Sequence, residues 1–464
     1  MGTALQFISQ DAHGIGSSDR RIIRSHVMRG KTAGKPHHST RKGVPSIHVR
    51  RIITGTSSSG FSKSRQLLWN DLCLTTFPQQ LDSESTKLMH RWFFDISDAL
   101  FPPQFCSKFD MVKSIWVNCI LADKAYFHCT LAISASYINF LERESRLSLQ
   151  TFHHISKAYE LVNLKLSGPG SISDSAIAAV ICLVIYQQIH NQLTVGLIHL
   201  QGLYRMIQLR GGVVELMQHN RMLALKALRL DVELALQNGS TLFKSDEVAL
   251  CMTSSDFHGP KEQSLGATPK LSDIMLNVVE FASDLNDRSR KGHRKLEPMK
   301  FTETLISLLY RLMEGAPLRR PNSVPGELSG KMTHLAMLAF LTSLLPVYVH
   351  DCSSYPLLSD CLQYTIQGFH SNYLDTETSG TLLILWSLFI SGVSVLKYGK
   401  HNCLLLSISK CCERLGISDW PTVRRKLSRF PWIYTLHDIP GKRLWEAAQK
   451  EVLGIPGSLK EVAS

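Results

Sequence analysis

Apolar residues recur at helical spacing along most of the chain from about Leu67 onward. Ile155, Ala158, Val162 and Leu166 follow one another at steps of three, four and four residues, which places them on one face of a helix. The strict apolar–polar alternation that indicates a strand is scarce in the sequence. The pattern therefore predicts an all-α fold.

Glycine and proline divide this pattern into separate helices. We expect the first helix to stop at Gly168-Pro169-Gly170, where a left-handed cap and a residue without an N–H oppose its continuation. Ser173 is placed to cap the next helix, AIAAVICLVIYQQI, which is apolar nearly all round and so belongs inside a large domain. A third helix begins near Thr194 and ends at Gly211-Gly212.

Further stripes extend the helical pattern. The third helix carries Leu200, Leu203, Tyr204 and Ile207 on one side, and a fourth stripe of Leu223, Ala227, Leu230 and Leu234 ends at Asn238-Gly239. Helices resume at residues 332–349, 381–397 and 404–415, whereas residues 239–272, 286–300 and 315–330 are polar or rich in Pro and Gly and are predicted to be loops. No fixed-period repeat is present. We predict that residues 66–464 form one large multi-helix regulatory domain of stacked antiparallel helices.

The positive charge of the chain is concentrated near its start. The formal net charge is +13, of which residues 1–65 carry +10 and the remaining 399 residues +3. This segment, here called the N-terminal arm (residues 1–65), lacks apolar periodicity and is rich in His, Ser and Gly, so we expect it to be disordered. Such a charge asymmetry favours contact with a polyanion or a transport receptor, a merely solvated tail being the alternative.

The basic side chains of the arm are the candidate contacts. They occur with no intervening acid and comprise Arg20, Arg21, Arg24, Arg29, Lys31, Lys35, Arg41, Lys42, Arg50 and Arg51. Separated basic pairs of this kind can bind an import receptor or neutralise phosphates. Because aromatic neighbours and a recognisable groove-binding element are absent around them, we predict only weak, sequence-independent nucleic-acid binding.

The targeting and redox signals point to an intracellular protein. The first residues lack the charged start and apolar core of a secretory signal. The apolar stretches 176–185, 335–349 and 381–396 are shorter than the ~18 residues of a membrane span, so we interpret them as buried core helices and expect no membrane partner. The eleven cysteines begin only at Cys73 and are predicted to be reduced and buried.

The sequence lacks complete motifs for nucleotide binding and catalysis. Gly30-Lys31-Thr32 has Ser25 where a phosphate loop requires its first Gly, and Gly14-x-Gly16 is followed by Asp19 where a dinucleotide-binding motif requires Gly. The sequence contains no H-E-x-x-H, G-x-S-x-G or C-x-x-C pattern. We therefore expect no catalytic residue and no cofactor.

The paired histidines and cysteines are poor metal ligands. His37-His38 lies in the arm, and the neighbours His153-His154 point about 100° apart if they lie on a helix. Cys411-Cys412 are adjacent, which is unfavourable geometry for one tetrahedral zinc ion. We expect no metal site. An enzyme built on an all-α pocket remains the third hypothesis after the two given below.

One run of residues has a distinctive pattern, H-x-x-G-L-x-x-M-I-x-x-R-G-G, from His199 to Gly212. Its physical interpretation is a core helix in which the small Gly202 lets a neighbouring helix approach, with Arg210 in the last turn and Gly211 or Gly212 as the cap. His199 is interpreted as a capped or solvent-edge residue and not as a ligand.

This pattern resembles the regulatory domain of fungal zinc-cluster transcription factors. The similarity extends to the C-terminal run that contains Trp432 and Trp445 and to the basic segment that begins at Arg20. The resemblance implies a helical domain that represses, dimerises or senses signals. The zinc cluster of such proteins needs six cysteines in two C-x2-C-x6-C groups, and no cysteine precedes Cys73, so sequence-specific DNA binding is not carried over.

Two hypotheses follow for the function. The leading one is a nuclear transcriptional regulator of fungal type, without its own zinc cluster, whose helical domain binds other transcription proteins or a second copy as a homodimer. The alternative is a cytoplasmic helical interaction or scaffold protein that shares the fold and is not involved in transcription.

Overall fold

The computed structural model describes residues 77–96, 101–109, 114–142, 149–252, 271–319, 328–345, 355–371, 378–396 and 402–452. All of them belong to one compact unit of the chain. Among these residues every regular element is a helix, and strand-like pairing is limited to an isolated bridge between Cys106 and Leu296. The predicted all-α fold is confirmed.

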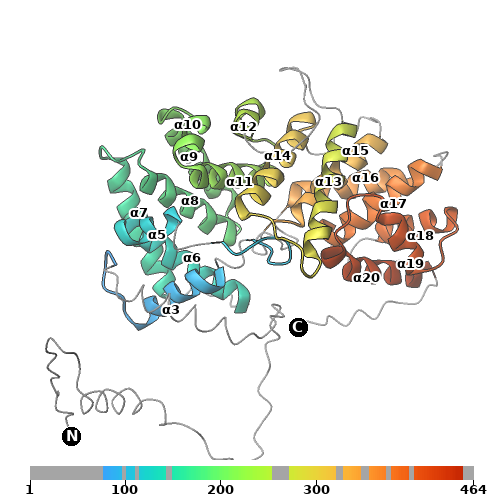
Figure 1. Cartoon of the computed structure of the whole chain (residues 1–464), viewed down its shortest axis with the longest axis horizontal. Coiled ribbons are helices and arrows are strands. Elements are labelled where there is room, and N and C mark those ends of the chain that lie inside the picture. The colour runs from blue at the N-terminus through green and yellow to red at the C-terminus, as the bar shows by residue number, and fades with distance from the viewer. Residues whose placement is uncertain are drawn as a thin grey trace, which may run out of the picture. The chain divides into compact units, whose positions relative to one another are not determined.

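The helices of the N-terminal half pack against one another as sequence neighbours (Figure 1). Helix α6 lies against α7 and α8, and α8 lies against α9. In chain order the elements are α3 (Ser83–Arg91) with the π-helical turn η1 (Trp92–Ile96), α5 (Ile115–Ala122), α6 (Lys124–Glu142), α7 (Leu149–Leu166), α8 (Asp174–Ile189), α9 (Leu193–Leu209), α10 (Val213–His219), α11 (Arg221–Asn238) and α12 (Ser245–Met252).

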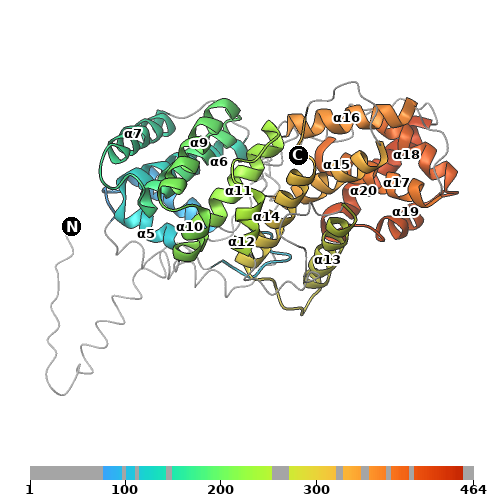
Figure 2. The same ribbon diagram turned by 90° about the horizontal axis from the view of Figure 1, so that it is seen from above.

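Helices α11 and α14 join this group to the C-terminal helices, and both views place them between the two groups (Figures 1 and 2). Helix α11 contacts α8 and α9 as well as α14 and α16. The C-terminal elements are α13 (Leu271–Ser289), α14 (Pro298–Gly315), α15 (Leu328–Thr342), α16 (Pro356–Ser371), α17 (Thr378–Ser391) with the π-helical turn η4 (Gly392–Leu396), α18 (Asn402–Arg414), α19 (Trp420–Leu427) and α20 (Tyr434–Val452).

The apolar stretches predicted to be core helices are enclosed. Every residue of α8 from Ala176 to Gln187 is buried, and so is every residue of α17 from Ile384 to Ile390. Helix α11 is buried from Leu223 to Leu236 with one exception, Lys226. Because each fully buried Leu or Ile contributes ~1.5–3 kcal/mol, these helices supply much of the free energy that opposes the conformational entropy of the chain.

The start and end of α8 are set by local hydrogen bonds. The Ser173 hydroxyl accepts a hydrogen bond from the Ala176 N–H (3.3 Å), which is the predicted N-cap. At the other end Asn191 has a φ of 54°, and the Gln192 N–H donates to the Gln187 carbonyl (2.9 Å). The three residues that follow α8 thus reverse the chain, so that α8 and α9 pack as a helical hairpin.

One helix, α12, lies entirely within a segment that the sequence pattern predicted to be a loop. Helix α12 forms inside residues 239–272, which were predicted to be a loop, because Val248, Cys251 and Met252 bury a short apolar stripe within an otherwise polar segment. Helix α16 begins with Pro356 in its first turn, where proline is well tolerated. A stripe of only two turns carries too little periodicity to be distinguished from a loop.

The end of α7 also differs from the prediction. Leu166, assigned to the buried stripe of this helix, is its last residue and is 38% exposed, because it projects beyond the contact with the neighbouring helices. Gly168 does not have the positive φ of a left-handed cap. Its N–H instead donates a hydrogen bond to the Lys165 carbonyl (3.1 Å). The helix does stop before Pro169, as expected.

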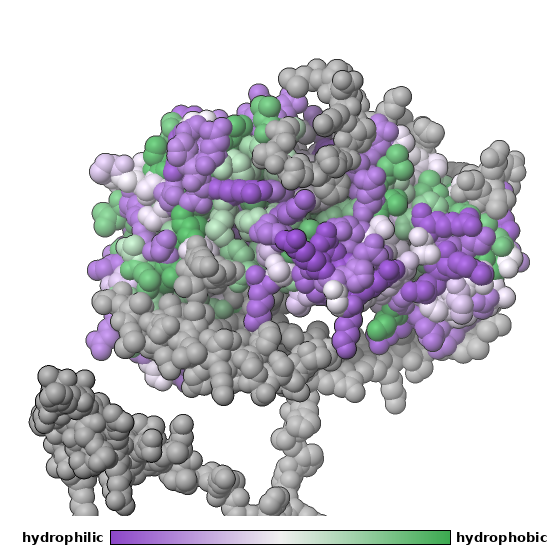
Figure 3. Space-filling view, in the orientation of Figure 1, coloured by the Kyte–Doolittle hydropathy of each residue, from purple (hydrophilic) through white to green (hydrophobic). Residues whose placement is uncertain are grey.

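The described surface is mixed in character (Figure 3). Helices α7 and α9 leave large apolar side chains exposed, including Leu149, Phe152, Leu164 and Ile198. In the part of the chain that the structure describes, no helix combines the length and apolarity needed to cross a bilayer. The cysteines described there are free thiols, all buried except the half-buried Cys403.

Candidate functional site

The glycine pair at the end of α9 forms a hydrogen-bonded helix cap. The Gly212 N–H donates to the Ile207 carbonyl (2.9 Å), and the Gly211 N–H donates to the Gln208 carbonyl (3.1 Å). Gly211 and Gly212 have φ of 105° and 95°, a backbone conformation that a Cβ disfavours. This is the geometry of a Schellman cap, so the two glycines serve the fold of the motif.

Arg210 links this cap to the start of α8. Its guanidinium forms an ion pair with Asp174 and donates to the Ile172 carbonyl (3.4 Å). The amide of Asn220 donates to the other carboxylate oxygen of Asp174 (2.7 Å). Since Asp174 lies in the first turn of α8, where an acid is favourable, a single carboxylate joins the ends of three helices.

The prediction for Gly202 is wrong. Gly202 is exposed, and a Cβ added there would have no atom within 4 Å. Gly196, by contrast, lies on the buried face of α9, where an added Cβ would be in ordinary van der Waals contact with the Gln187 Cβ at 3.5 Å. The reason is helical phase, because Gly196, Leu200 and Leu203 share the buried face of α9 and Gly202 does not.

His199 has the environment of a packing residue. It is half-buried, and its ring lies against that of Tyr159 with a centroid distance of 5.8 Å and an interplanar angle of 25°. Burial lowers the pKa of His199. Tyr159 in turn accepts a hydrogen bond from the Gln187 amide (2.5 Å), which connects the ring stack to α8.

A carboxylate at the start of α20 organises the C-terminal run. The indole Nε1 of Trp432, which is fully buried, donates to Asp438 Oδ1 (2.8 Å), and Arg424 Nε donates to Asp438 Oδ2 (2.7 Å). The Asn286 amide donates to the Trp432 carbonyl (2.8 Å). These bonds join α13, α19 and α20, so the conspicuous residues of this run hold helices together.

Gly441 and Trp445 complete this run. An added Cβ at Gly441, inside α20, would lie 2.9 Å from ring atoms of both Trp420 and Trp432, so only glycine fits without movement of an indole. Trp445 is partly buried against the same core. The indole N–H of Trp445 is buried, and no described residue accepts a hydrogen bond from it.

His437 is a buried histidine held in its neutral form. Its Nδ1 accepts a hydrogen bond from the Ile433 N–H (3.0 Å), and its Nε2 lies 3.0 Å from the Ser343 hydroxyl. Burial lowers the pKa of His437 to about 3. Protonation of Nδ1 would also break the bond from Ile433, so this part of the fold disfavours acid.

A pair of buried histidines joins α6 to α7. His154 Nδ1 lies 3.0 Å from His128 Nδ1, and burial lowers the pKa of each ring to about 4. His153 is exposed, as expected for helical neighbours that point apart. No cluster of three or more His, Cys, Asp or Glu residues suited to a metal ion occurs within the described ranges.

Lowering the pH should therefore destabilise the protein. Between about pH 6.5 and pH 4 these histidines bind protons in the unfolded chain, where their pKa values are ordinary, but not in the folded one. The free energy of unfolding therefore decreases as the pH is lowered, by up to about 1.4 kcal/mol per pH unit for each histidine. Urea unfolding at pH 7, 6 and 5 measures this slope.

Two variants assign the effect to a residue. His437→Gln removes one of the titrating groups, so the slope of its stability against pH should be smaller than that of the parent protein. His293→Gln removes an exposed histidine and should leave the slope unchanged. Equal slopes for all three proteins would contradict the assignment to His437.

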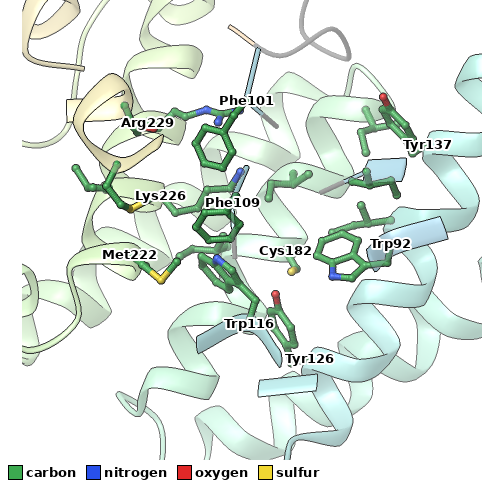
Figure 4. A pocket seen from close by; sticks show the side chains of 18 residues that line it. Trp92, Phe101, Phe109, Trp116, Tyr126, Tyr137, Cys182, Met222, Lys226 and Arg229 are labelled. Carbon is green, nitrogen blue, oxygen red and sulfur yellow. The ribbon is translucent and has the colours of Figure 1, made fainter. Parts of the chain in front are cut away.

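A cavity lies among α6, α8, α11 and α14, beside the turn η1 (Figure 4). Its aromatic wall consists of Trp92, Phe101, Phe109, Trp116, Tyr126 and Tyr137. The rings of Phe101 and Phe109 are 5.2 Å apart, and those of Trp116 and Tyr126 stack at 6.2 Å. The cavity volume is about 70 Å³, several times the ~10–15 Å³ that one water molecule needs on the same measure.

Two cations contribute to this wall, Lys226 and Arg229, whereas no described lining residue is an acid. Arg229 is buried and donates to Glu233 (2.7 Å), which also accepts a hydrogen bond from Gln188 (3.3 Å). Lys226 has no such carboxylate contact. Burial and, to a smaller extent, the neighbouring Arg229 charge lower the pKa of Lys226 to about 7, against the opposing effect of Glu233.

None of the residues that line this cavity was a candidate site residue from the sequence. Its walls come from segments scattered between Trp92 and Thr302, which no local pattern connects. A signal was nevertheless present, because Lys226 is a charged residue in the middle of the apolar run LALKAL (residues 223–228). The ten basic candidates of the arm lie outside the described residues.

The described domain is all-helical, and its two conspicuous sequence runs are explained by caps and packing. The family model of the fungal specific transcription factor domain matches residues 88–402, from within α3 to the start of α18. The chain therefore belongs to this family, and the predicted resemblance is confirmed. Comparison with curated proteins and with solved structures yielded no match.

Proposed function

We propose that this protein is a nuclear transcriptional regulator that acts through its helical domain and has no catalytic activity. The observation that carries the proposal is membership of the fungal specific transcription factor family over residues 88–402, which indicates transcriptional regulation. Because the two motif runs are engaged in packing, they support a structural role and not chemistry. The proposal includes no zinc cluster and no cofactor.

The helical domain is proposed to bind other transcription proteins or a second copy of the chain. The exposed apolar side chains of α7 and α9, Leu149 and Ile198 among them, support protein contacts, since exposed apolar groups lose water favourably at interfaces. No membrane partner is proposed.

The N-terminal arm is proposed to direct nuclear import and to make weak contacts with nucleic acid. Its net charge of +10 and its separated basic pairs, such as Arg20-Arg21 and Arg41-Lys42, support this role. Contact with phosphates requires no fixed fold, so the arm needs only its charge.

Deleting residues 1–65 should abolish nuclear accumulation of a tagged copy in living cells while the helical domain stays folded. The reason is that an import receptor recognises the basic pairs and not the nearly neutral domain. Microscopy of the tagged protein measures accumulation, and circular dichroism of the purified deletion variant tests the fold.

A substitution variant provides the matched control. Changing the ten basic candidates of the arm to Gln in the full-length chain keeps its length and should have the same effect as the deletion. A tagged full-length protein that stays in the cytosol would contradict the proposal and favour the cytoplasmic scaffold instead.

A further inference from the structure

The cavity contains a positive charge that the described residues do not neutralise. Lys226 is the one residue of α11 between Leu223 and Leu236 that is not buried, because its side chain borders the cavity. Figure 4 shows Met222, Lys226 and Arg229 on one side of the space and Trp92 on the other. The charged group thus faces a largely apolar and aromatic enclosure.

Lys226 has no hydrogen-bond or ion-pair partner among the residues that the structure describes. Arg229, its neighbour one turn away, is paired with Glu233. A cation in an apolar site without a counter-charge is unfavourable, and an anion placed beside it would remove that cost. The site is therefore electrostatically complementary to an anion.

The remaining lining limits the anion to one charge and an apolar body. Apart from the two cations, the polar groups of the wall are few, and the Thr302 hydroxyl already donates to the Pro298 carbonyl (2.9 Å). A phosphate or dicarboxylate would leave charges without partners, and a sugar would leave hydroxyl groups unpaired. A flat or aliphatic hydrocarbon body fits beside Phe101, Phe109 and Trp116.

We propose that this cavity binds a small hydrophobic monocarboxylate, with its carboxylate paired to Lys226 and its apolar body among the aromatic rings. This goes beyond the function proposed above, because binding is measured on the purified protein whether or not the protein acts in transcription. A regulator with such a site would respond to the concentration of an organic acid.

The test uses the full-length protein and matched ligands. Isothermal titration calorimetry compares 3-phenylpropanoate and octanoate with their primary amides, which keep the shape and lose the charge. At least one carboxylate should bind about tenfold more tightly than its amide. A tenfold ratio of affinities corresponds to a difference of about 1.4 kcal/mol in binding free energy, which the ion pair with Lys226 would supply.

Substitutions locate the site. Lys226→Met keeps the length and apolar stem of the side chain and should lower the affinity for the carboxylate about tenfold, with no loss for the amide. Met222→Trp, one turn earlier on α11, should fill the cavity and prevent binding of both. Lys442→Met, on the exposed surface of α20, should change neither. Melting temperatures of all variants establish that they are folded.

Raising the pH gives an independent readout. As Lys226 loses its proton, with a pKa of about 7, affinity for the carboxylate should fall between pH 6 and 9, whereas affinity for the amide should not. Two other titratable groups near the ammonium, Cys182 and Tyr126, do not change charge in this range. Burial raises the pKa of Cys182 to about 12 and that of Tyr126 well above its ordinary value, and Arg229 is paired with Glu233.

Four results would overturn the proposal. The first is equal affinity for a carboxylate and its amide, and the second is unchanged carboxylate binding by folded Lys226→Met. The third is the absence of binding by folded parent protein to both carboxylates at millimolar concentration. Binding that persists in folded Met222→Trp would place the site elsewhere and would also contradict it.

Discussion

Replacing Leu203 by aspartate is expected to unfold or aggregate the protein. Leu203 is completely buried on α9, on the face shared with Leu200 and Ile207. Its replacement removes an apolar side chain and places a carboxylate on the buried apolar face of α9. The cost of several kcal/mol approaches the total stability of ~5–15 kcal/mol typical of a domain. Circular dichroism and size-exclusion chromatography of the purified variant measure the loss of folded protein.

A control on the same helix separates burial from charge. Ile198→Asp introduces the same carboxylate into α9 at a side chain that is 60% exposed, and should leave the melting temperature within a few degrees of the parent value. Leu203→Ala should lie between the two, with a loss of about 2–5 kcal/mol. A Leu203→Asp protein with helical content and melting temperature like the parent would show that α9 does not pack as described.

The helices that the sequence predicted well are those with long, uninterrupted stripes. Helices α8 and α11 bury nearly every residue, so their apolar runs were visible without the structure, as were the stop of α9 at Gly211-Gly212 and that of α11 at Gly239. Helix α12 was missed because its buried residues span only two turns. The 65/66 boundary of the predicted domain lies outside the described residues and stays a prediction.

Side-chain partnerships were less predictable than helices. The pattern around Arg210 identified a helix cap, but its ion pair with Asp174 joins residues from different helices and has no local signature. Gly202 was assigned to the wrong face, because a one-step error in helical phase rotates a residue by about 100°. Whether a glycine permits close approach depends on which neighbouring helix lies beside it, and periodicity does not supply that information.

The residues that line the cavity were even less predictable from the sequence than these side-chain partners. Its rings and its lysine become neighbours only after α6, α8, α11 and α14 have packed. A single lysine in an apolar run is visible in the sequence. Whether its side chain extends to solvent or borders an enclosed space depends on the tertiary arrangement. Electrostatic complementarity to a ligand is thus a property of the folded state.

Nucleic-acid binding by the full-length protein is expected to be weak, indifferent to sequence and strongly dependent on salt. The arm carries a net charge of +10, whereas the rest of the chain carries only +3. Binding should therefore come from the arm, whose contacts with phosphates release the counterions condensed on the DNA. With about six phosphate contacts, the logarithm of the affinity should fall with a slope of roughly −5 against the logarithm of salt. Between 50 and 200 mM salt the affinity should therefore fall on the order of 10³-fold.

Fluorescence anisotropy with a labelled 30-base-pair duplex and its scrambled counterpart measures this slope. The two duplexes should bind equally, because phosphate contacts carry no sequence information. The full-length variant with the ten basic arm residues changed to Gln should lose the binding, since it keeps the helical domain and removes the charges that displace counterions. Binding that survives 200 mM salt, prefers one duplex and persists in the Gln variant would instead require a DNA-reading surface in the helical domain.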